Sequence, residues 1–234
     1  MKSNCIIAFA GHMIDRNDRI APRFPPYIEP AVRMKIRKTI EYLNPAAAIS
    51  SAACGGDIIF AEEMLAYGAL LYVILPFEDR EDFIFQSVAS AGPGWIERFE
   101  GVCSQAIPAP YFVKPGNYES DQDFEANQRA LVFFALGVAA ASNSSLKCLI
   151  LCDEQQLGNQ IGGTRSFLEL CQGLNIPYEI IDLAAIRLEH MRDTDMLIEH
   201  SPVQPGGTEA HNDHACFITR NPSYSSIFQP QLPR

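Results

Sequence analysis

The chain has 234 residues, of which 47% are hydrophobic and 20% are charged. Acidic residues outnumber basic residues by 28 to 18, so the formal net charge is −10. This composition is typical of a globular protein with a sizeable core and argues against a disordered chain. The acidic balance argues against an extended surface for nucleic acid or for anionic membranes.

The apolar pattern predicts strands and helices that alternate along the chain. In chain order we expect a strand at 4–10, a long loop at 11–30, a helix at 31–43, a strand at 46–51, a helix at 58–67, a strand at 70–75 ended by Pro76, helical material at 78–106, a helix at 123–141, a strand at 147–152, a helix from 164 to 173 and a strand at 178–181. This alternation predicts an α/β fold with an open, mostly parallel sheet and helices on both faces.

The chain changes character near residue 187. From there prolines and glycines interrupt the sequence, and hydrophobic periodicity is weak. We therefore expect a folded domain over residues 1–186 and a proline-rich C-terminal extension over residues 187–234.

No segment has the pattern of a membrane or export signal. The longest apolar run, at 130–141, is shorter than the roughly 20 residues that a spanning helix needs. The first residues lead into a short apolar stretch that ends at Gly11, which fits neither a secretory signal nor a lipidation motif. We expect a cytoplasmic protein without a membrane partner.

Seven cysteines are present, an odd number without CxxC spacing. We interpret them as reduced thiols that fill apolar space. His211, His214 and Cys216 lie close together near the C-terminus, but no further ligand pair accompanies them, so we expect no metal site.

Three loops follow expected strand ends at the edge where open α/β sheets bind ligands, at 11–13, 50–57 and 153–165. Two of them place paired glycines directly before a helix, where the missing Cβ and the free N–H groups favour a phosphate. The simpler interpretation of each turn is a helix start capped by Asp57 or Thr164. Neither turn matches the dinucleotide or P-loop fingerprint.

The segments at 8–15 (AFAGHMID), 22–26 (PRFPP), 50–57 (SSAACGGD) and 162–164 (GGT) resemble, in this order, the SLOG superfamily of Rossmann-like domains. That superfamily includes DNA-processing-A proteins, LOG phosphoribohydrolases and nucleotide-sensing modules of bacterial signalling and conflict systems. The resemblance covers residues 5–183 and implies a site for a nucleotide or a nucleotide-derived second messenger.

Carried over to this chain, the resemblance implies a ligand site made of Gly11, His12, Ser51, Gly55, Gly56, Asp57, Gly162, Gly163 and Thr164. Gly11 and His12 would border the ligand, and the last three residues would hold phosphate. For His12, the alternatives are a proton donor, a phosphate contact or a loop residue that holds the backbone.

Three further candidates rest on chemistry alone. Arg23 and Arg165 would supply the positive charge that an anionic ligand needs in so acidic a protein; the alternative for each is a structural or solvent-facing ion pair. Asn127, at the start of an apolar helix, would contact a base or ribose, or would make a hydrogen bond at the helix start.

The resemblance favours a ligand sensor in bacterial signalling or defence, with no catalytic residues, no cofactor besides the nucleotide-type ligand, and an output through self-association or an effector partner. The alternative is LOG-like cleavage of the N-glycosidic bond of a nucleoside monophosphate. LOG proteins place a glutamate three residues after the threonine, where this chain has Phe167; Glu169 lies on a different helical face. This departure argues against hydrolysis, and the net charge argues against a nucleic-acid partner.

Overall fold

The computed structural model describes residues 5–16, 18–107, 111–157 and 162–199. In chain order the elements are β1 (Cys5–Gly11), η1 (Pro26–Ile28), α1 (Glu29–Leu43), β2 (Ala47–Ser50), α2 (Gly56–Ala66), β3 (Leu70–Phe77), α3 (Arg80–Ser87), η2 (Ala89–Ala91), α4 (Pro93–Gln105), β4 (Tyr111–Lys114), α5 (Asp121–Ala141), β5 (Ser145–Cys152), η3 (Glu154–Gln156), α6 (Thr164–Gly173), β6 (Tyr178–Asp182) and α7 (Leu183–Glu199).

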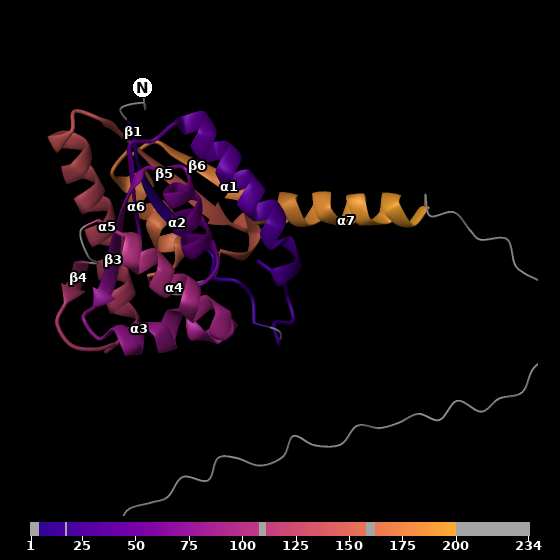
Figure 1. Cartoon of the computed structure of the whole chain (residues 1–234), viewed down its shortest axis with the longest axis horizontal. Helices are drawn as coiled ribbons and strands as arrows, with labels where there is room; N and C mark the ends of the chain where they lie inside the picture. The colour runs from indigo at the N-terminus through magenta and orange to yellow at the C-terminus, as the bar shows by residue number, and fades with distance from the viewer. Residues whose placement is uncertain (1–4, 17, 108–110, 158–161, 200–234) are drawn as a thin grey trace, which may run out of the picture. The chain divides into compact units, whose positions relative to one another are not determined.

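Within these residues, six parallel strands form one sheet in the order β4-β3-β2-β1-β5-β6 (Figure 1). β1 is central, since Ile7 pairs with Ala48 of β2 on one side and with Lys147 of β5 on the other. The chain first builds the sheet outward from β1 through β2, β3 and β4, and then crosses to β5 on the opposite side of β1. The α/β class with a Rossmann-like parallel sheet, predicted from the sequence, is confirmed.

Helices cover both faces of the sheet, and each face has its own apolar core. Alternate residues of β1 point to opposite faces. Ile7 and Phe9 belong to the core shared with α1, α2, α4 and α7, whereas Ile6 and Ala8 belong to the core shared with α5 and α6. Phe9 stacks on Phe60 of α2 with ring centroids 4.1 Å apart. Burial on both faces explains why the central strand reads as a continuous apolar run.

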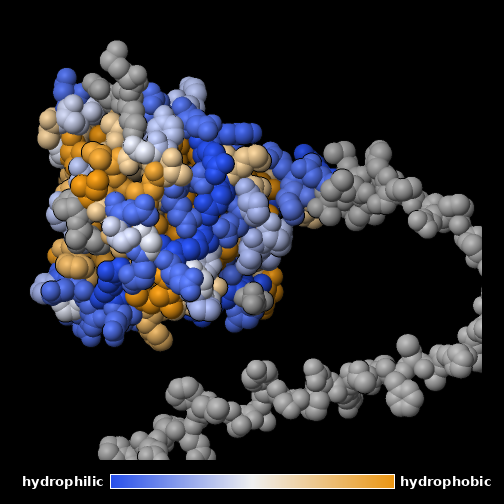
Figure 2. Space-filling view, in the orientation of Figure 1, coloured by the Kyte–Doolittle hydropathy of each residue, from blue (hydrophilic) through white to orange (hydrophobic). Residues whose placement is uncertain are grey.

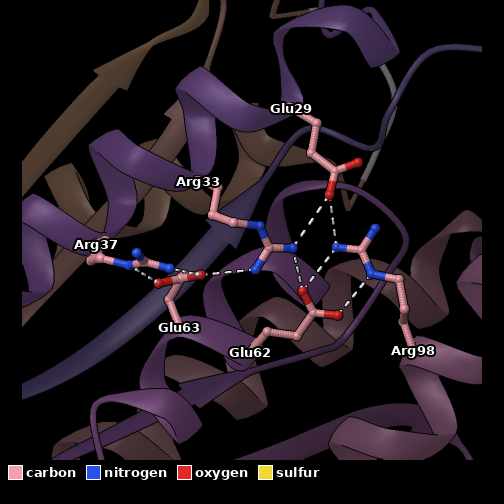
Figure 3. Close-up of polar contacts among 6 residues, drawn as sticks. All are labelled: Glu29, Arg33, Arg37, Glu62, Glu63 and Arg98. Carbon is pink, nitrogen blue, oxygen red and sulfur yellow. Dashed lines mark hydrogen bonds and ion pairs between the residues drawn. The ribbon is translucent and has the colours of Figure 1, made fainter.

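An ion-pair network joins α1, α2 and α4 and is formed by Glu29, Arg33, Arg37, Glu62, Glu63 and Arg98 (Figure 3). The Glu63 side chain is only 3% exposed and accepts hydrogen bonds from Arg33 at 2.8 Å and Arg37 at 2.7 Å. Hydrophilic side chains run along α1 on the surface shown in Figure 2. The network therefore joins the polar side of α1 to α2 and α4, while Val32, Ile36 and Ile40 of the same helix are buried in the core.

Two strand predictions differ from the structure. β3 continues through Pro76 to Phe77. Val73 is the last residue of β3 that pairs with β2, so Pro76, which has no backbone N–H, lies beyond the hydrogen bonds between these two strands. The short strand β4 was not predicted. It is four residues long, follows two prolines in the sequence and pairs only with β3 at the edge of the sheet.

Helix α7 extends well past residue 187, where the sequence suggests the start of an extension. Leu183 and Ile186 are buried in the core on the α1 side. Arg187 donates a hydrogen bond to the Arg23 carbonyl and pairs with Asp153 at 2.6 Å. These contacts make the first turns of α7 part of the folded unit, which spans Met1–Glu199. None of the described helices has the length and apolar character needed to cross a membrane.

Candidate functional site

A cavity of about 530 Å³ lies at the carboxyl ends of β1, β2 and β5. This is the point between β1 and β5 where the strand order reverses, and open α/β sheets bind ligands there. The volume is in the range of small-molecule sites. Its walls come from the loop after β1, the turn after β2, α3, the start of α5 and the turn before α6.

His12 follows β1, lines the cavity and is 4% exposed. Its backbone N–H donates to the Leu151 carbonyl at 2.9 Å, and its carbonyl accepts from the Gly56 N–H at 3.0 Å. Ring Nδ1 lies 3.1 Å from Thr164 Oγ1, while Nε2 is buried and has no hydrogen-bond partner among the described residues. Burial, followed by the positive charge of Arg23, lowers the pKa of His12 to about 4. The ring is therefore neutral at pH 7 and has one nitrogen left to contact an occupant of the cavity.

Three arginines of the loop after β1 line the cavity: Arg16, Arg19 and Arg23. Asp15 shapes this loop, because it pairs with Arg19 at 3.2 Å and accepts hydrogen bonds from the backbone N–H groups of Arg23 at 2.7 Å and Phe24 at 2.8 Å. Arg23 Nε is buried and lacks a partner within the described ranges. Burial and then the nearby Arg19 lower the pKa of Arg23 below its ordinary value. The loop thus places three arginines beside the cavity, together with the carboxylates of Asp15 and Asp18.

Asp57 is buried and bonded on both carboxylate oxygens. Oδ1 accepts from the Gly11 N–H at 2.9 Å, and Oδ2 accepts from the Ser51 hydroxyl at 2.6 Å and the Ala53 N–H at 3.3 Å. Burial raises the pKa of Asp57 to about 6, even though these three hydrogen bonds lower it. Both Ser51 and Asp57 line the cavity, and their bonds tie the ends of β1 and β2 to the start of α2.

The glycine pair before α2 packs against protein rather than lining the cavity. A Cβ on Gly55, which has φ +95°, would lie 2.3 Å from Ile14 N, and a Cβ on Gly56 would lie 2.9 Å from Gly11 Cα. The Gly56 N–H donates to the carbonyl of His12. These glycines therefore allow the start of α2 to contact the loop after β1, which corrects their predicted placement around the ligand.

The glycine pair before α6 is arranged differently. Gly162 has φ +77° and packs on α5, where a Cβ would lie 2.5 Å from Phe124 Cβ. Its N–H donates to Ser166 Oγ at 3.1 Å. Gly163 and Thr164 line the cavity, and their backbone N–H groups have no acceptor in the part of the chain that the structure describes. The first N–H groups of a helix carry its positive dipole end, so this turn offers an anion-binding start that α2 lacks.

Helix α5 and the loop before it supply amide and aromatic groups. Asn127 is 2% exposed, and its Oδ1 lacks a partner among described residues. Gln128 donates from Nε2 to the Gly162 carbonyl at 3.3 Å, while its buried Oε1 is likewise unpartnered there. Tyr118 and Phe124, whose ring centroids are 5.7 Å apart, also line the cavity. This part of the wall combines hydrogen-bond acceptors with apolar ring surface.

The cavity brings together most of the predicted site residues, namely Gly11, His12, Arg23, Ser51, Asp57, Asn127, Gly162, Gly163 and Thr164. Arg165 is not among its lining residues. It is exposed and pairs with Glu169 at 3.1 Å, which matches the ion pair given above as the alternative interpretation of this residue. Sequence reasoning missed Arg16, Arg19, Gln128, Tyr118 and Phe124. The position of Gln128 next to Asn127 was a usable signal, whereas the aromatic residues belong to a loop and helix start without a recognisable motif.

Within the described residues, no group of three or more His, Cys, Asp and Glu side chains is arranged to hold a metal. Six cysteines there carry free thiols, and all but Cys5 are buried. His211, His214 and Cys216 lie outside the described residues.

No protein-family profile and no curated protein matches the chain. Among solved structures, the chain is similar to DNA processing protein A of Helicobacter pylori, with a TM-score of 0.32, 14% identity and 82% of each chain covered. It is also similar to DNA processing protein A of Streptococcus pneumoniae, with a TM-score of 0.32, 12% identity and 74% of this chain covered. The match covers only 57% of that second protein. At these scores the similarities carry no argument about function.

Proposed function

We propose that the chain binds a nucleotide or a nucleotide-derived second messenger in this cavity and acts as a ligand sensor. One observation carries the proposal: four residues that line this cavity each have a buried polar atom without a partner among the described residues, namely His12 Nε2, Arg23 Nε, Asn127 Oδ1 and Gln128 Oε1. Buried polar groups in folded proteins almost always have a hydrogen-bond partner. We therefore expect the partner to be a polar occupant of the cavity.

Part of the cavity wall suits an anionic occupant, although the lining as a whole holds four aspartates, Asp15, Asp18, Asp57 and Asp121, against three arginines. The N–H groups of Gly163 and Thr164 stand at the positive end of α6, and Arg16, Arg19 and Arg23 line the same cavity. Helix starts and arginines are the groups that proteins use most readily to hold phosphate. The rings of Tyr118 and Phe124 offer apolar surface to a planar base. A phosphate joined to a polar sugar and a base matches these three features.

The hydrolase alternative has less support. Phe167, which takes the place of the LOG glutamate, is fully buried in the core on the α5 and α6 side. Glu169 is exposed and pairs with Arg165, and neither lines the cavity. Asp57 does line it, but its oxygens accept hydrogen bonds from protein donors.

The sensor proposal has three further parts. They are membership of the SLOG superfamily, a cytoplasmic location, and an output through self-association or an effector.

The Helicobacter protein, which is similar at low score, is described as binding single-stranded DNA. This chain carries a net charge of −10, which disfavours a long phosphate backbone, whereas a cavity of about 530 Å³ suits a single nucleotide. A short oligo(dT) belongs in the binding test for this reason.

The test is a thermal-shift panel with 5′-AMP, ADP-ribose, cyclic AMP and oligo(dT). A ligand at 100 times its Kd adds about 2.7 kcal/mol of stability, which raises Tm by roughly 5–11 °C for a domain of this size. We expect Arg23→Ala to lose the shift and Arg165→Ala, a matched arginine outside the cavity, to keep it. No shift with any nucleotide, or a full shift with Arg23→Ala, would contradict the proposal. Free base found by chromatography of the same mixtures would favour the hydrolase.

A further inference from the structure

Two unpartnered amide oxygens lie side by side in the sequence on the second turn of α5. Asn127 Oδ1 and Gln128 Oε1 are both buried, both belong to residues that line the cavity, and neither has a donor among the described residues. A carbonyl oxygen accepts hydrogen bonds and cannot donate them. The pair therefore calls for hydrogen-bond donors on whatever occupies the cavity.

The orientation of the Gln128 amide is set by its own contact. Nε2 donates to the Gly162 carbonyl at 3.3 Å, and a carbonyl cannot serve as a donor, so Oε1 is the atom left for the cavity. Gly162 directly precedes the two residues whose N–H groups form the start of α6. Gln128 consequently lies beside the turn where we expect the phosphate of the ligand, and Asn127 is its neighbour in α5.

In a nucleotide, the part nearest to the phosphate is the sugar. The donors of a ribose are its 2′ and 3′ hydroxyl groups, which sit on neighbouring carbons, and a deoxyribose lacks one of them. Amino groups of a base are the other donors that a nucleotide offers, but they lie at the far end of the molecule from the phosphate. Position therefore favours the hydroxyl pair as the partner of the two amide oxygens.

We propose that Asn127 and Gln128 accept hydrogen bonds from the vicinal hydroxyls of a ribose and so make the site selective for ribonucleotides over deoxyribonucleotides. This inference rests on the proposed nucleotide site. A site built to bond a hydroxyl discriminates against an analogue that lacks it, because its own buried acceptor is then left unpaired. The two side chains are specificity determinants of binding.

The test is calorimetric titration with 5′-AMP, 2′-deoxy-AMP and 3′-deoxy-AMP. We expect each deoxy analogue to bind roughly tenfold more weakly than AMP. Ribose 5-phosphate and 2-deoxyribose 5-phosphate repeat the comparison without a base, and we expect the same preference. Because these comparisons use the unaltered protein, they remain decisive even where a variant fails to fold.

Variants assign the preference to residues. Asn127→Leu and Gln128→Leu are each expected to weaken AMP binding to the level of a deoxy analogue and to leave deoxy-AMP binding nearly unchanged. Gln122→Leu, on an exposed position of α5 outside the cavity, is the control and should retain the preference.

The outcomes separate the two proposals. Equal affinity for AMP and both deoxy analogues overturns the ribose inference while the nucleotide site stands. A preference for AMP that survives both leucine variants also overturns it, because the hydroxyls would then be recognised by other residues. If no nucleotide or sugar phosphate binds at all, the proposed function itself fails.

Discussion

Replacing Gly56 with alanine is expected to destabilise the protein, although alanine is the better helix former. An ideal Cβ on residue 56 would lie 2.9 Å from Gly11 Cα and 2.9 Å from Leu151 Cδ2. Favourable contacts between carbon atoms lie near 3.5–4.0 Å. The Gly11 contact is with backbone, so the start of α2 and the end of β1 have to move apart, and the hydrogen bond from the Gly56 N–H to the His12 carbonyl has to lengthen.

The magnitude follows from two opposing effects. Overpacking a close contact costs about 1–3 kcal/mol, whereas alanine gains at most about 1 kcal/mol over glycine in a helix. The net loss is about 1–2 kcal/mol, or a Tm lower by roughly 2–8 °C. Gly137→Ala is the matched control, because Gly137 lies in α5 with nothing within 4 Å of the added Cβ, and there the helix gain alone is expected to raise Tm.

The assay is thermal unfolding of both variants, followed by circular dichroism. Opposite shifts are expected, downward for Gly56→Ala and upward for Gly137→Ala. If Gly56→Ala were as stable as the wild type, the close contact between α2 and the loop after β1 would be refuted, and with it the argument that this glycine pair serves packing.

Three further predictions concern buried charge. Glu63→Gln should lower the free energy of unfolding by about 1.5–3 kcal/mol at pH 7. Burial alone would raise the pKa of Glu63, but hydrogen bonds from two arginines lower it, so this stability is lost as pH falls through that lowered pKa. The free energies of unfolding of variant and wild type, measured with urea, should therefore converge in acid. Burial raises the pKa of Asp57 from 3.8 to about 6. The free energy of unfolding of the wild type should therefore decrease by on the order of 3 kcal/mol between pH 4 and 6, whereas that of Asp57→Asn should not. Parallel pH profiles of the two proteins would contradict this. Arg187→Ala leaves Asp153, whose side chain is 1% exposed, without its cation, so the free energy of unfolding should fall by about 3 kcal/mol. Nucleotide binding should also weaken, because Arg187 holds the carbonyl of Arg23 in the loop after β1. An unchanged free energy of unfolding would count against this link between α7 and that loop.

Much of the sheet could be predicted because buried parallel strands are short apolar runs that end at polar or glycine loops. The first strand was expected at 4–10 and is Cys5–Gly11. β4 was not predicted because it has only four residues, which pair with β3 alone at the edge of the sheet and follow prolines in the sequence. Helix α7 escaped because its apolar periodicity is weak and its first turns are held by tertiary contacts, such as that between Arg187 and Asp153.

The site was only partly predictable for a related reason. The two glycine pairs look equivalent in the sequence, yet Gly56 gives its N–H to the His12 carbonyl, whereas no such acceptor meets Gly163 within the described residues. Which loop lies against which helix start is a property of the tertiary structure. The same holds for Gln128, whose free oxygen is defined by a bond to Gly162, 34 residues away in the chain.

The most direct test of the nucleotide site is a crystal structure of the protein grown with saturating 5′-AMP. The account predicts density for the nucleotide at the ends of β1, β2 and β5, with phosphate oxygens within about 3.2 Å of the Gly163 and Thr164 N–H groups and a polar ligand atom within the same reach of His12 Nε2. Density for the nucleotide at another place on the protein, or a cavity without it at that concentration, would contradict the account.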